Sequence, residues 1–270
     1  MIRQNPLSQP STYVSHYQPN LLFSLPRKNK REEIGIDYPL PFQGEDVWNA
    51  YELSWLNAKG KPEVAGAEFI IPCESPNLIE SKSFKLYLNS FNNTLFDSFT
   101  AVESFLQRDL SAAADAPVHI KLISLHQAST TLHQHFDGTF LDELDIACDT
   151  YTPFPDYLKT GHHLVTETVY SNLLKSNCLV TGQPDWGSVS ITYTGKQIEH
   201  EGLLKYIVSF RNHNEFHEQC VERIFMDIMR YCAPEKLLVY ARYTRRGGLD
   251  INPYRANYAT KPQNIRLWRQ

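Results

Sequence analysis

The sequence has no apolar run approaching the roughly 20 residues that a helix needs to cross a bilayer. Its N-terminus is polar and carries Pro6 and Pro10, with no apolar segment of the kind found in secretory signals. These absences argue against a membrane protein and against an exported one. We therefore expect a soluble cytoplasmic protein with no membrane partner.

The sequence also lacks a surplus of basic residues. Lys and Arg number 26 against 30 Asp and Glu, which leaves a formal net charge of −4 with neutral histidines. Domains that bind a nucleic-acid backbone usually carry a positive excess. We predict no direct nucleic-acid partner, although a local basic pocket for a phosphorylated cofactor remains compatible with this balance.

Several nucleotide- and metal-binding signatures are missing. Neither GxGxxG nor GxxxxGK[ST] occurs, so neither a Rossmann dinucleotide site nor a P-loop is indicated. The cysteines form no CxxC pair and have no zinc-site spacing, so no metal is predicted. Their odd number in a chain without an export signal is typical of reduced thiols. They are Cys73, Cys148, Cys178, Cys220 and Cys232.

What is present indicates a globular enzyme of one or two domains. The chain has 270 residues, of which 42% are hydrophobic and 12% aromatic, enough for a sizeable core. Residues 1–30 contain repeated prolines and end in a basic run, which predicts an extended N-terminal arm. Apolar periodicity predicts helices from Asp97 to about Leu110 and over 216–232. Alternation or short apolar runs predict strands over 67–71, 82–91, 118–125, 164–170, 189–193, 203–210 and, as the closing strand, 237–243.

The order of predicted elements recurs in the two halves. Aligning Tyr87 with Tyr206 also superimposes Ser90 on Ser209, Phe91 on Phe210 and Asn93 on Asn212. We interpret this as two diverged copies of one ββα-rich unit. The predicted organisation is an arm over 1–30, a first unit over 31–150 and a second unit over 151–270.

Three segments carry residues suited to chemistry. Cys178 lies in a polar loop, and the Gly182–Pro184 turn could bring Asp185 back toward its thiol, an arrangement suited to nucleophilic addition with proton donation. A small buried apolar residue is the alternative for any lone cysteine.

The other two segments leave similar alternatives open. His217 and Glu218 are the first residues of a predicted helix. They either bind a purine-like base or only stabilise the helix N-terminus. Arg245 to Gly248 follow a strand and form either a phosphate cradle or a solvated basic turn, and Ser81 and Lys82 could serve the same ligand.

Through these motifs the chain resembles the NADPH-dependent 7-cyano-7-deazaguanine reductases, the nitrile reductases of queuosine biosynthesis, a tRNA modification pathway. Residues 80–91 match the motif E-S-K-S-x-K-x-Y-x-x-S-F. The likeness extends to the loop 178–185 and to the segments 209–213, 216–218 and 246–253.

The resemblance implies a fold and an assembly. The motifs are split between the halves, since the second half has Glu199-His200-Glu201 where E-S-K would stand. This is similar to the long branch of the family, in which one chain holds two tunnelling-fold (T-fold) units and one complete site. The implied class is α+β, with antiparallel sheets and helices packed on one face, assembling as a homodimer.

The resemblance also implies a mechanism. The Cys178 thiolate would attack the nitrile carbon to form a covalent thioimide, and Asp185 would supply a proton to the nitrogen. Two NADPH molecules would then reduce the adduct to 7-aminomethyl-7-deazaguanine. The substrate would be bound by Ile79, Glu80, Ser81, Phe216, His217 and Glu218, and NADPH by Ser81, Lys82, Arg246 and Gly247.

Two functions of other classes are compatible with the same scaffold. One is a pterin- or purine-binding protein without redox activity, against which Cys178 and Asp185 argue. The other is a hydrolase related to GTP cyclohydrolase I, which would require zinc, for which the sequence has no signature.

Overall fold

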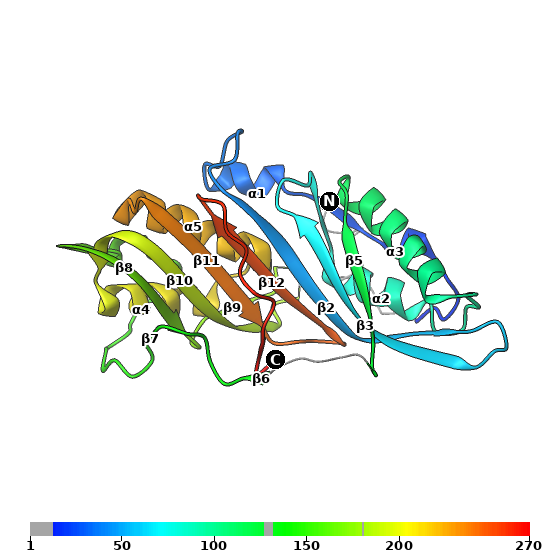
Figure 1. Cartoon of the computed structure of the whole chain (residues 1–270). Coiled ribbons are helices and arrows are strands. Elements are labelled where there is room, and N and C mark those ends of the chain that lie inside the picture. Colours follow the sequence, from blue (N-terminus) through cyan, green and yellow to red (C-terminus); the bar gives the residue numbers. More distant parts are fainter. Residues whose placement is uncertain (1–12, 127–131, 180) are drawn as a thin grey trace. The chain divides into compact units, whose positions relative to one another are not determined.

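A computed structural model describes residues 13–126, 132–179 and 181–270 (Figure 1). The chain forms mixed α+β structure with mainly antiparallel strand pairing, which confirms the predicted class. It divides into two compact units that are discontinuous along the chain. The first unit comprises residues 1–30, 46–130 and 245–250, and the second 31–45, 131–244 and 251–270. The predicted repeat boundaries at residues 30 and 150 stay a prediction.

The first unit contains an antiparallel sheet with helices on one face. Its strands are β2 (Gln43–Leu56), β3 (Pro62–Pro72) and β5 (His119–Ser124), in the order β5-β3-β2. Figure 1 shows α2 (Ser81–Asn89) and α3 (Phe99–Ala114) on the same side of these strands. A small pair, β1 (Ser24–Pro26) with β4 (Asn77–Ile79), leads into α2. Rings of Trp48 and Phe69 on the sheet pack on Phe84 of α2, with centroids 5.2 and 5.0 Å apart.

The prediction of a strand over 82–91 is wrong, because this segment is α2. The Glu80 carboxylate caps the helix, accepting hydrogen bonds from the backbone amides of Lys82 at 2.8 Å and Ser83 at 2.7 Å. Phe84, Tyr87 and Leu88 are buried, a spacing of three and four residues that fits one helix face. The apolar alternation in the sequence is a by-product of this spacing.

The second unit has a larger sheet. Its main strands are β8 (Thr160–Ser171), β10 (Pro184–Ile198), β11 (Lys236–Tyr243) and β12 (Leu249–Ala256), which starts in the first unit. The helices α4 (His200–Ser209) and α5 (His217–Cys232) lie on one side of it in Figure 1. Shorter elements complete the unit: α1 (Lys28–Glu33), whose residues from Arg31 belong here, β6 (Leu132–His133), β7 (Thr139–Phe140), β9 (Lys175–Asn177), β13 (Arg266–Leu267) and 3₁₀ turns at Pro155–Tyr157 and Phe210–Asn212.

The second half shows the same error of element type. The predicted strand over 203–210 is wrong, since these residues form most of α4, with Leu203, Leu204 and Ile207 buried. The helix over 216–232 is confirmed as α5, and the strand over 237–243 as β11. That strand does not close the sheet, because β12 pairs with it antiparallel, Tyr240 opposite Tyr254.

The predicted strands over 67–71, 164–170 and 189–193 are confirmed within β3, β8 and β10, and the one over 118–125 is confirmed as β5, which is one residue shorter at each end. The helix predicted from Asp97 to about Leu110 is α3, which begins at Phe99 and ends at Ala114. Ser98 is its N-cap, and its hydroxyl accepts from the Ala101 amide at 3.1 Å. None of the helices in the described part of the chain is long and apolar enough to cross a membrane.

The aligned tyrosines occupy matching positions in the two helix pairs. The Tyr87 hydroxyl in α2 donates to Asp109 of α3 at 2.7 Å, and the Tyr206 hydroxyl in α4 donates to Asp227 of α5 at 2.7 Å. Ser90 and Ser209 each donate to the carbonyl of the preceding tyrosine at 2.6 Å. The aligned residues therefore mark equivalent positions, on helices rather than on the predicted strand ends.

The arm folds back on its own unit, along α2. The Val14 carbonyl accepts from the Asn89 side chain at 3.0 Å, and the Ser15 carbonyl from the Asn93 amide at 2.8 Å. Further along, the Phe23 amide donates to the Ser83 hydroxyl at 3.0 Å. These bonds hold the described part of the arm beside the helix that carries the E-S-K-S motif.

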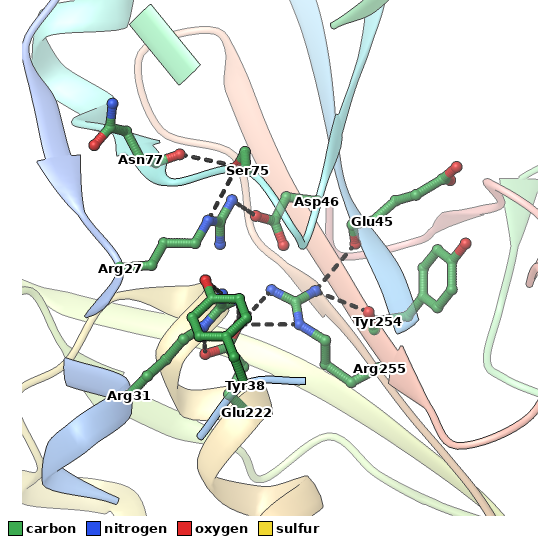
Figure 2. Close-up of polar contacts among 10 residues, drawn as sticks. All are labelled: Arg27, Arg31, Tyr38, Glu45, Asp46, Ser75, Asn77, Glu222, Tyr254 and Arg255. Atoms are coloured by element: carbon green, nitrogen blue, oxygen red, sulfur yellow. Dashed lines mark hydrogen bonds and ion pairs between the residues drawn. The ribbon is translucent and has the colours of Figure 1, made fainter. Parts of the chain in front are cut away.

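Each unit contains a buried ionic cluster (Figure 2). In the second unit, Glu222 of α5 accepts from Arg31 at 2.6 and 3.0 Å and from Arg255 of β12 at 2.9 and 3.1 Å. In the first unit, Arg27 donates to Asp46 at 2.6 Å and to the Ser75 hydroxyl at 3.1 Å. Buried charges of this kind are tolerated only when paired. Glu222 thus fixes the α1 segment and β12 to α5.

Candidate active site

The Cys178 loop is the end of a hairpin formed by β9 and β10. Asp185 pairs with Ser176 across the two strands. The Cys178 amide donates to the Gln183 carbonyl at 2.8 Å, and the Gly182 amide to the Cys178 carbonyl at 3.0 Å. Gly182 has φ +67°, a left-handed conformation that glycine adopts readily. The loop therefore doubles back as predicted, which brings Asp185 to the strand opposite the one that leads into Cys178.

Asp185 is in contact with the first residue of α5. Its Oδ1 lies 3.3 Å from Nε2 of His217, and both side chains are buried. The sequence assigned His217 to substrate binding and did not predict this pair. An imidazole beside a carboxyl group can stabilise the carboxylate and exchange a proton with it.

Tyr243, at the end of β11, packs on the same imidazole. The rings of Tyr243 and His217 have centroids 4.2 Å apart and meet edge to face at 83°. Burial holds the pKa of Tyr243 far above its usual range, so the phenol stays protonated. Gly187 on β10 faces this ring, and a Cβ there would lie 3.1 Å from it.

The sequence did not predict a role for Tyr243. The signal for such a role is Gly187 in β10, because a glycine is needed opposite the Tyr243 ring of the neighbouring strand. That relation depends on strand register and was not readable from the sequence.

Glu218 and Cys220 follow His217 on α5. Glu218 is buried in the first turn, and so is Cys220, two residues further along the helix. Burial and the negative charge of Glu215 raise the pKa of the Cys220 thiol well above its ordinary value, so this thiol remains neutral. Burial likewise raises the pKa of Cys232 to about 12. Neither thiol is suited to be a nucleophile.

A short segment before α5 forms hydrogen bonds with Asn177, the residue next to Cys178. The Asn177 amide donates to the His213 carbonyl at 2.8 Å, and the Glu215 amide to the Asn177 carbonyl at 3.0 Å. The Glu215 carboxylate accepts two hydrogen bonds from Arg223 at 2.8 and 3.0 Å and lies 2.9 Å from Nε2 of His213. Although burial opposes it, these partners hold the pKa of Glu215 below its ordinary value.

The remaining predicted site residues lie in the first unit. Ile79 ends β4, and Glu80, Ser81 and Lys82 form the start of α2. Burial raises the pKa of Glu80 above its ordinary value, although the Lys82 and Ser83 amides and the positive charges of Lys85 and Lys82 act in the opposite direction. Glu80 is therefore a buried carboxyl group with both oxygens already accepting backbone hydrogen bonds.

A cavity of about 310 Å³ is lined by Lys82 and Gly247, two of the four residues that the sequence assigned to NADPH, and not by Ser81 or Arg246. Gly247 and its neighbour Gly248 have φ of +55° and +75° in the turn before β12. A Cβ on Gly248 would lie 2.6 Å from the Glu52 carboxylate, so this turn needs glycine. Arg246, half-buried, precedes the turn, and its amide donates to the Leu249 carbonyl at 2.9 Å. The cavity is lined by Tyr13, Ala50, Glu52, Leu53, Lys82, Lys85, Leu86, Leu88, Asn89, Asn92, Gly247, Gly248 and Leu249.

The predicted site residues thus form two groups, one in each unit. Cys178, Asp185, Phe216, His217 and Glu218 belong to the second unit, and Ile79, Glu80, Ser81, Lys82, Arg246 and Gly247 to the first. Within the described ranges, no three His, Cys, Asp or Glu side chains are arranged to hold a metal ion.

Comparison with known proteins finds two family models that match the chain. Residues 13–122 match the family described as "Nitrile reductase, 7-cyano-7-deazaguanine-reductase N-term", and residues 184–262 match "QueF-like protein". An archaeosine synthase QueF-Like crystal structure in the apo form has a TM-score of 0.32 and 16% identity, covering 37% of this chain and 99% of that chain. That likeness is too weak to bear on the fold.

Full-length relatives are much closer in sequence. Proteins named NADPH-dependent 7-cyano-7-deazaguanine reductase are 57% identical in Paraburkholderia xenovorans, covering 99% of this chain and 98% of the relative, and 59% identical in Cupriavidus necator, covering 98% of each. The one from Dechloromonas aromatica is 61% identical over 98% of this chain and 95% of the relative. The chain therefore belongs to the family of NADPH-dependent 7-cyano-7-deazaguanine reductases, which are oxidoreductases.

Proposed function

We propose that this protein reduces the nitrile of 7-cyano-7-deazaguanine to the primary amine of 7-aminomethyl-7-deazaguanine, through a thioimide formed on Cys178. The observation that carries the proposal is the pairing of Asp185 with His217 beside the Cys178 hairpin. A nucleophile, an acid and a group that stabilises the acid's conjugate base are then supplied by one unit.

The covalent step uses groups of the second unit. The Cys178 sulfur, as thiolate, forms a bond to the nitrile carbon, and one C–N π bond opens. Asp185 gives its proton to the nitrogen, and the resulting carboxylate is stabilised by the adjacent imidazole of His217. Covalent addition divides a difficult reduction of a nitrile into easier steps.

The overall reaction consumes two NADPH and two protons, and it releases the Cys178 thiolate unchanged. NADPH, when bound, supplies the two hydrides. The protein's part is to align the adduct and to exclude water while the Asp185–His217 pair provides protons. Phe216, immediately before α5, is proposed to cover the nitrile.

Recognition of the base is proposed to use buried carboxylates. Glu218 and Glu80 would accept hydrogen bonds from the N–H edge of the deazaguanine, with His217 and the backbone at Ile79 and Ser81 in support. Both carboxylates are almost fully buried.

The first unit has features that fit NADPH. The Gly247–Gly248 turn has no Cβ, so backbone can approach a phosphate, and Lys82 lines the same cavity. We assign NADPH to Ser81, Lys82, Arg246 and Gly247. We also propose a homodimer acting in the cytoplasm without a direct nucleic-acid partner, consistent with the charge balance of the chain.

Intact-protein mass spectrometry tests this proposal. Incubation with 7-cyano-7-deazaguanine alone should add the mass of one substrate molecule to the wild type. C178A should show no addition, whereas C148A should retain it, because Cys148 is a half-buried thiol outside the site. An adduct of unchanged yield on C178A would contradict the assignment.

A further inference from the structure

Gln270 is buried, although it lies in the irregular segment that follows β13. Its side chain is 6% exposed. The side-chain oxygen accepts from Nε of Arg242 at 2.6 Å and from the Leu267 amide at 3.1 Å. The side-chain nitrogen donates to the Tyr243 carbonyl at 3.1 Å and to Oδ1 of Asn252 at 2.8 Å. Both halves of the amide are thus satisfied by neighbours that are themselves buried.

These bonds occur near the point where the pairing of β11 with β12 stops. The register between the two strands ends at Tyr240, opposite Tyr254. The next residue of β12 along this ladder is Pro253, and proline has no amide hydrogen to donate to a neighbouring strand. Beyond this point the Gln270 side chain donates to a residue of each strand. It therefore links the ends of the two strands.

Tyr243, one of the residues linked in this way, also supports the candidate acid pair. Its carbonyl accepts from Gln270, and its ring packs on the His217 imidazole with centroids 4.2 Å apart. The buried phenol faces the Cys220 sulfur, a weak acceptor, and has no oxygen or nitrogen partner among the described residues. No strong hydrogen bond of its own hydroxyl anchors the ring, so its position depends on the backbone of Tyr243.

The two halves of the Gln270 amide serve different neighbours. Arg242 is 1% exposed, and its buried guanidinium needs acceptors, of which Oδ1 of Asn264 at 2.9 Å is another. A carboxylate at position 270 would serve Arg242 equally well. Only the nitrogen half requires an amide, because a carboxylate has no N–H to give to the Tyr243 carbonyl. What distinguishes glutamine here is therefore its donor half.

We infer that Gln270 is a positioning residue for the candidate active site: it fixes the backbone of Tyr243 and, through the Tyr243 ring, the His217 imidazole beside Asp185. The inference rests on the proposed function and deepens it, because it adds a residue that touches neither substrate nor cofactor. Asn252 is the second acceptor of the same amide, which gives this residue of the segment 246–253 a role that the sequence left open.

The test uses Q270E, which keeps the acceptor for Arg242 but places an oxygen against the Tyr243 carbonyl. Repulsion between the two oxygens should shift the end of β11. The kcat of nitrile-dependent NADPH oxidation should fall by about 10-fold or more, since a misplacement of about 1 Å can cost roughly 100-fold. The KM for NADPH should stay close to that of the wild type, because no residue assigned to NADPH belongs to this network.

The matched control is W268A, which alters a side chain of the same segment that is 74% exposed. Its kcat should equal that of the wild type. A kcat of Q270E equal to that of the wild type would overturn the inference. So would a kcat that falls equally in Q270E and W268A, because the effect would then belong to the segment and not to the amide.

NMR of the His217 ring protons gives a measurement that needs no turnover. The signal is identified by its loss in H217Q. Because the imidazole meets the Tyr243 ring edge to face, the ring current of Tyr243 acts on it, and the signal should shift in Q270E but not in W268A. Urea unfolding is measured in parallel. A lower urea midpoint in Q270E with the His217 signal and kcat unchanged would show a purely structural role and overturn the inference.

These outcomes separate the inference from the proposed function. The adduct on Cys178 is tested on the wild type with the nitrile alone. If the wild type forms no adduct, the proposed function fails, whatever the NMR of Q270E shows. If the wild type forms the adduct and Q270E turns over at the wild-type rate, only the inference about Gln270 fails.

Discussion

Nε2 of His217 lies 3.3 Å from Oδ1 of Asp185, and the two residues come from α5 and from the hairpin that presents Cys178. This contact joins the proposed acid to an imidazole that also packs against the Tyr243 ring. The position of the His217 imidazole therefore depends on its contacts with both Asp185 and Tyr243.

Replacing Asp185 by Asn should strongly reduce turnover, because the amide keeps the shape of the side chain but has no carboxylic proton to give. A general acid contributes on the order of 10²–10⁴-fold to a rate. We therefore expect nitrile-dependent NADPH oxidation in D185N to fall by at least about 100-fold. Binding of 7-cyano-7-deazaguanine, measured by calorimetry, should persist. Turnover at the wild-type rate would show that another group donates the proton.

Replacing Gly187 by Ala should disturb the support of His217. The new methyl group would lie 3.1 Å from a Tyr243 ring that is fully buried and has little room to yield. Overpacking of this kind costs about 1–3 kcal/mol, measurable by urea unfolding. Turnover should also fall, because a displaced Tyr243 ring shifts the His217 imidazole that packs on it.

The matched control is G161A, in β8 of the same unit, where the nearest atom to a new Cβ is 3.8 Å away. We expect its stability and activity to be close to those of the wild type. Equal effects of the two substitutions would contradict the role assigned to the Tyr243 ring.

Replacing Glu222 by Gln should destabilise the second unit. The carboxylate is the shared partner of Arg31 and Arg255, all three buried, and its neutralisation removes the ion pairs that it forms with both guanidinium groups. Removing one partner of a buried ion pair costs about 3–5 kcal/mol. Urea unfolding measures this loss. K261Q, which removes the exposed pair with Glu45, should cost under about 1 kcal/mol.

Low pH should weaken the contacts of the segment 213–215 with Asn177, because it protonates Glu215. The folded-state pKa of this group lies below its ordinary value of 4.5, as hydrogen bonds from His213 and Arg223 outweigh burial. Its contribution to stability is therefore complete above about pH 4.5 and is lost as the pH falls through the folded pKa. The free energy of unfolding should fall less steeply with acidification in E215Q than in the wild type. Identical pH profiles would exclude this contribution.

Local patterns in the sequence were enough for much of this protein. The long amphipathic helix over 216–232 and the strands at 189–193 and 237–243 have a single period that fits only one element type. The motif at 80–91 and the loop 178–185 were also sufficient to indicate the family, because the residue types of a site are written in the sequence even when their distances are not.

Two segments, 82–91 and 203–210, were ambiguous because apolar residues spaced by two, three and four positions fit both a strand and a helix. The capping of α2 by Glu80 decides the first in favour of a helix. Likewise, the aligned Tyr87 and Tyr206 were correctly matched but assigned to the wrong element, because an identity reports equivalence and not conformation.

Contacts between segments distant in the chain were decided by tertiary structure alone. The pairing of Asp185 with His217, the Tyr243 ring against Gly187, and Glu222 between Arg31 and Arg255 join residues whose separation along the chain carries no information about proximity. Strand register and helix packing bring them together, and those depend on the burial of many side chains at once. The sequence by itself therefore determined which groups are available for chemistry, and the fold determined which of them touch.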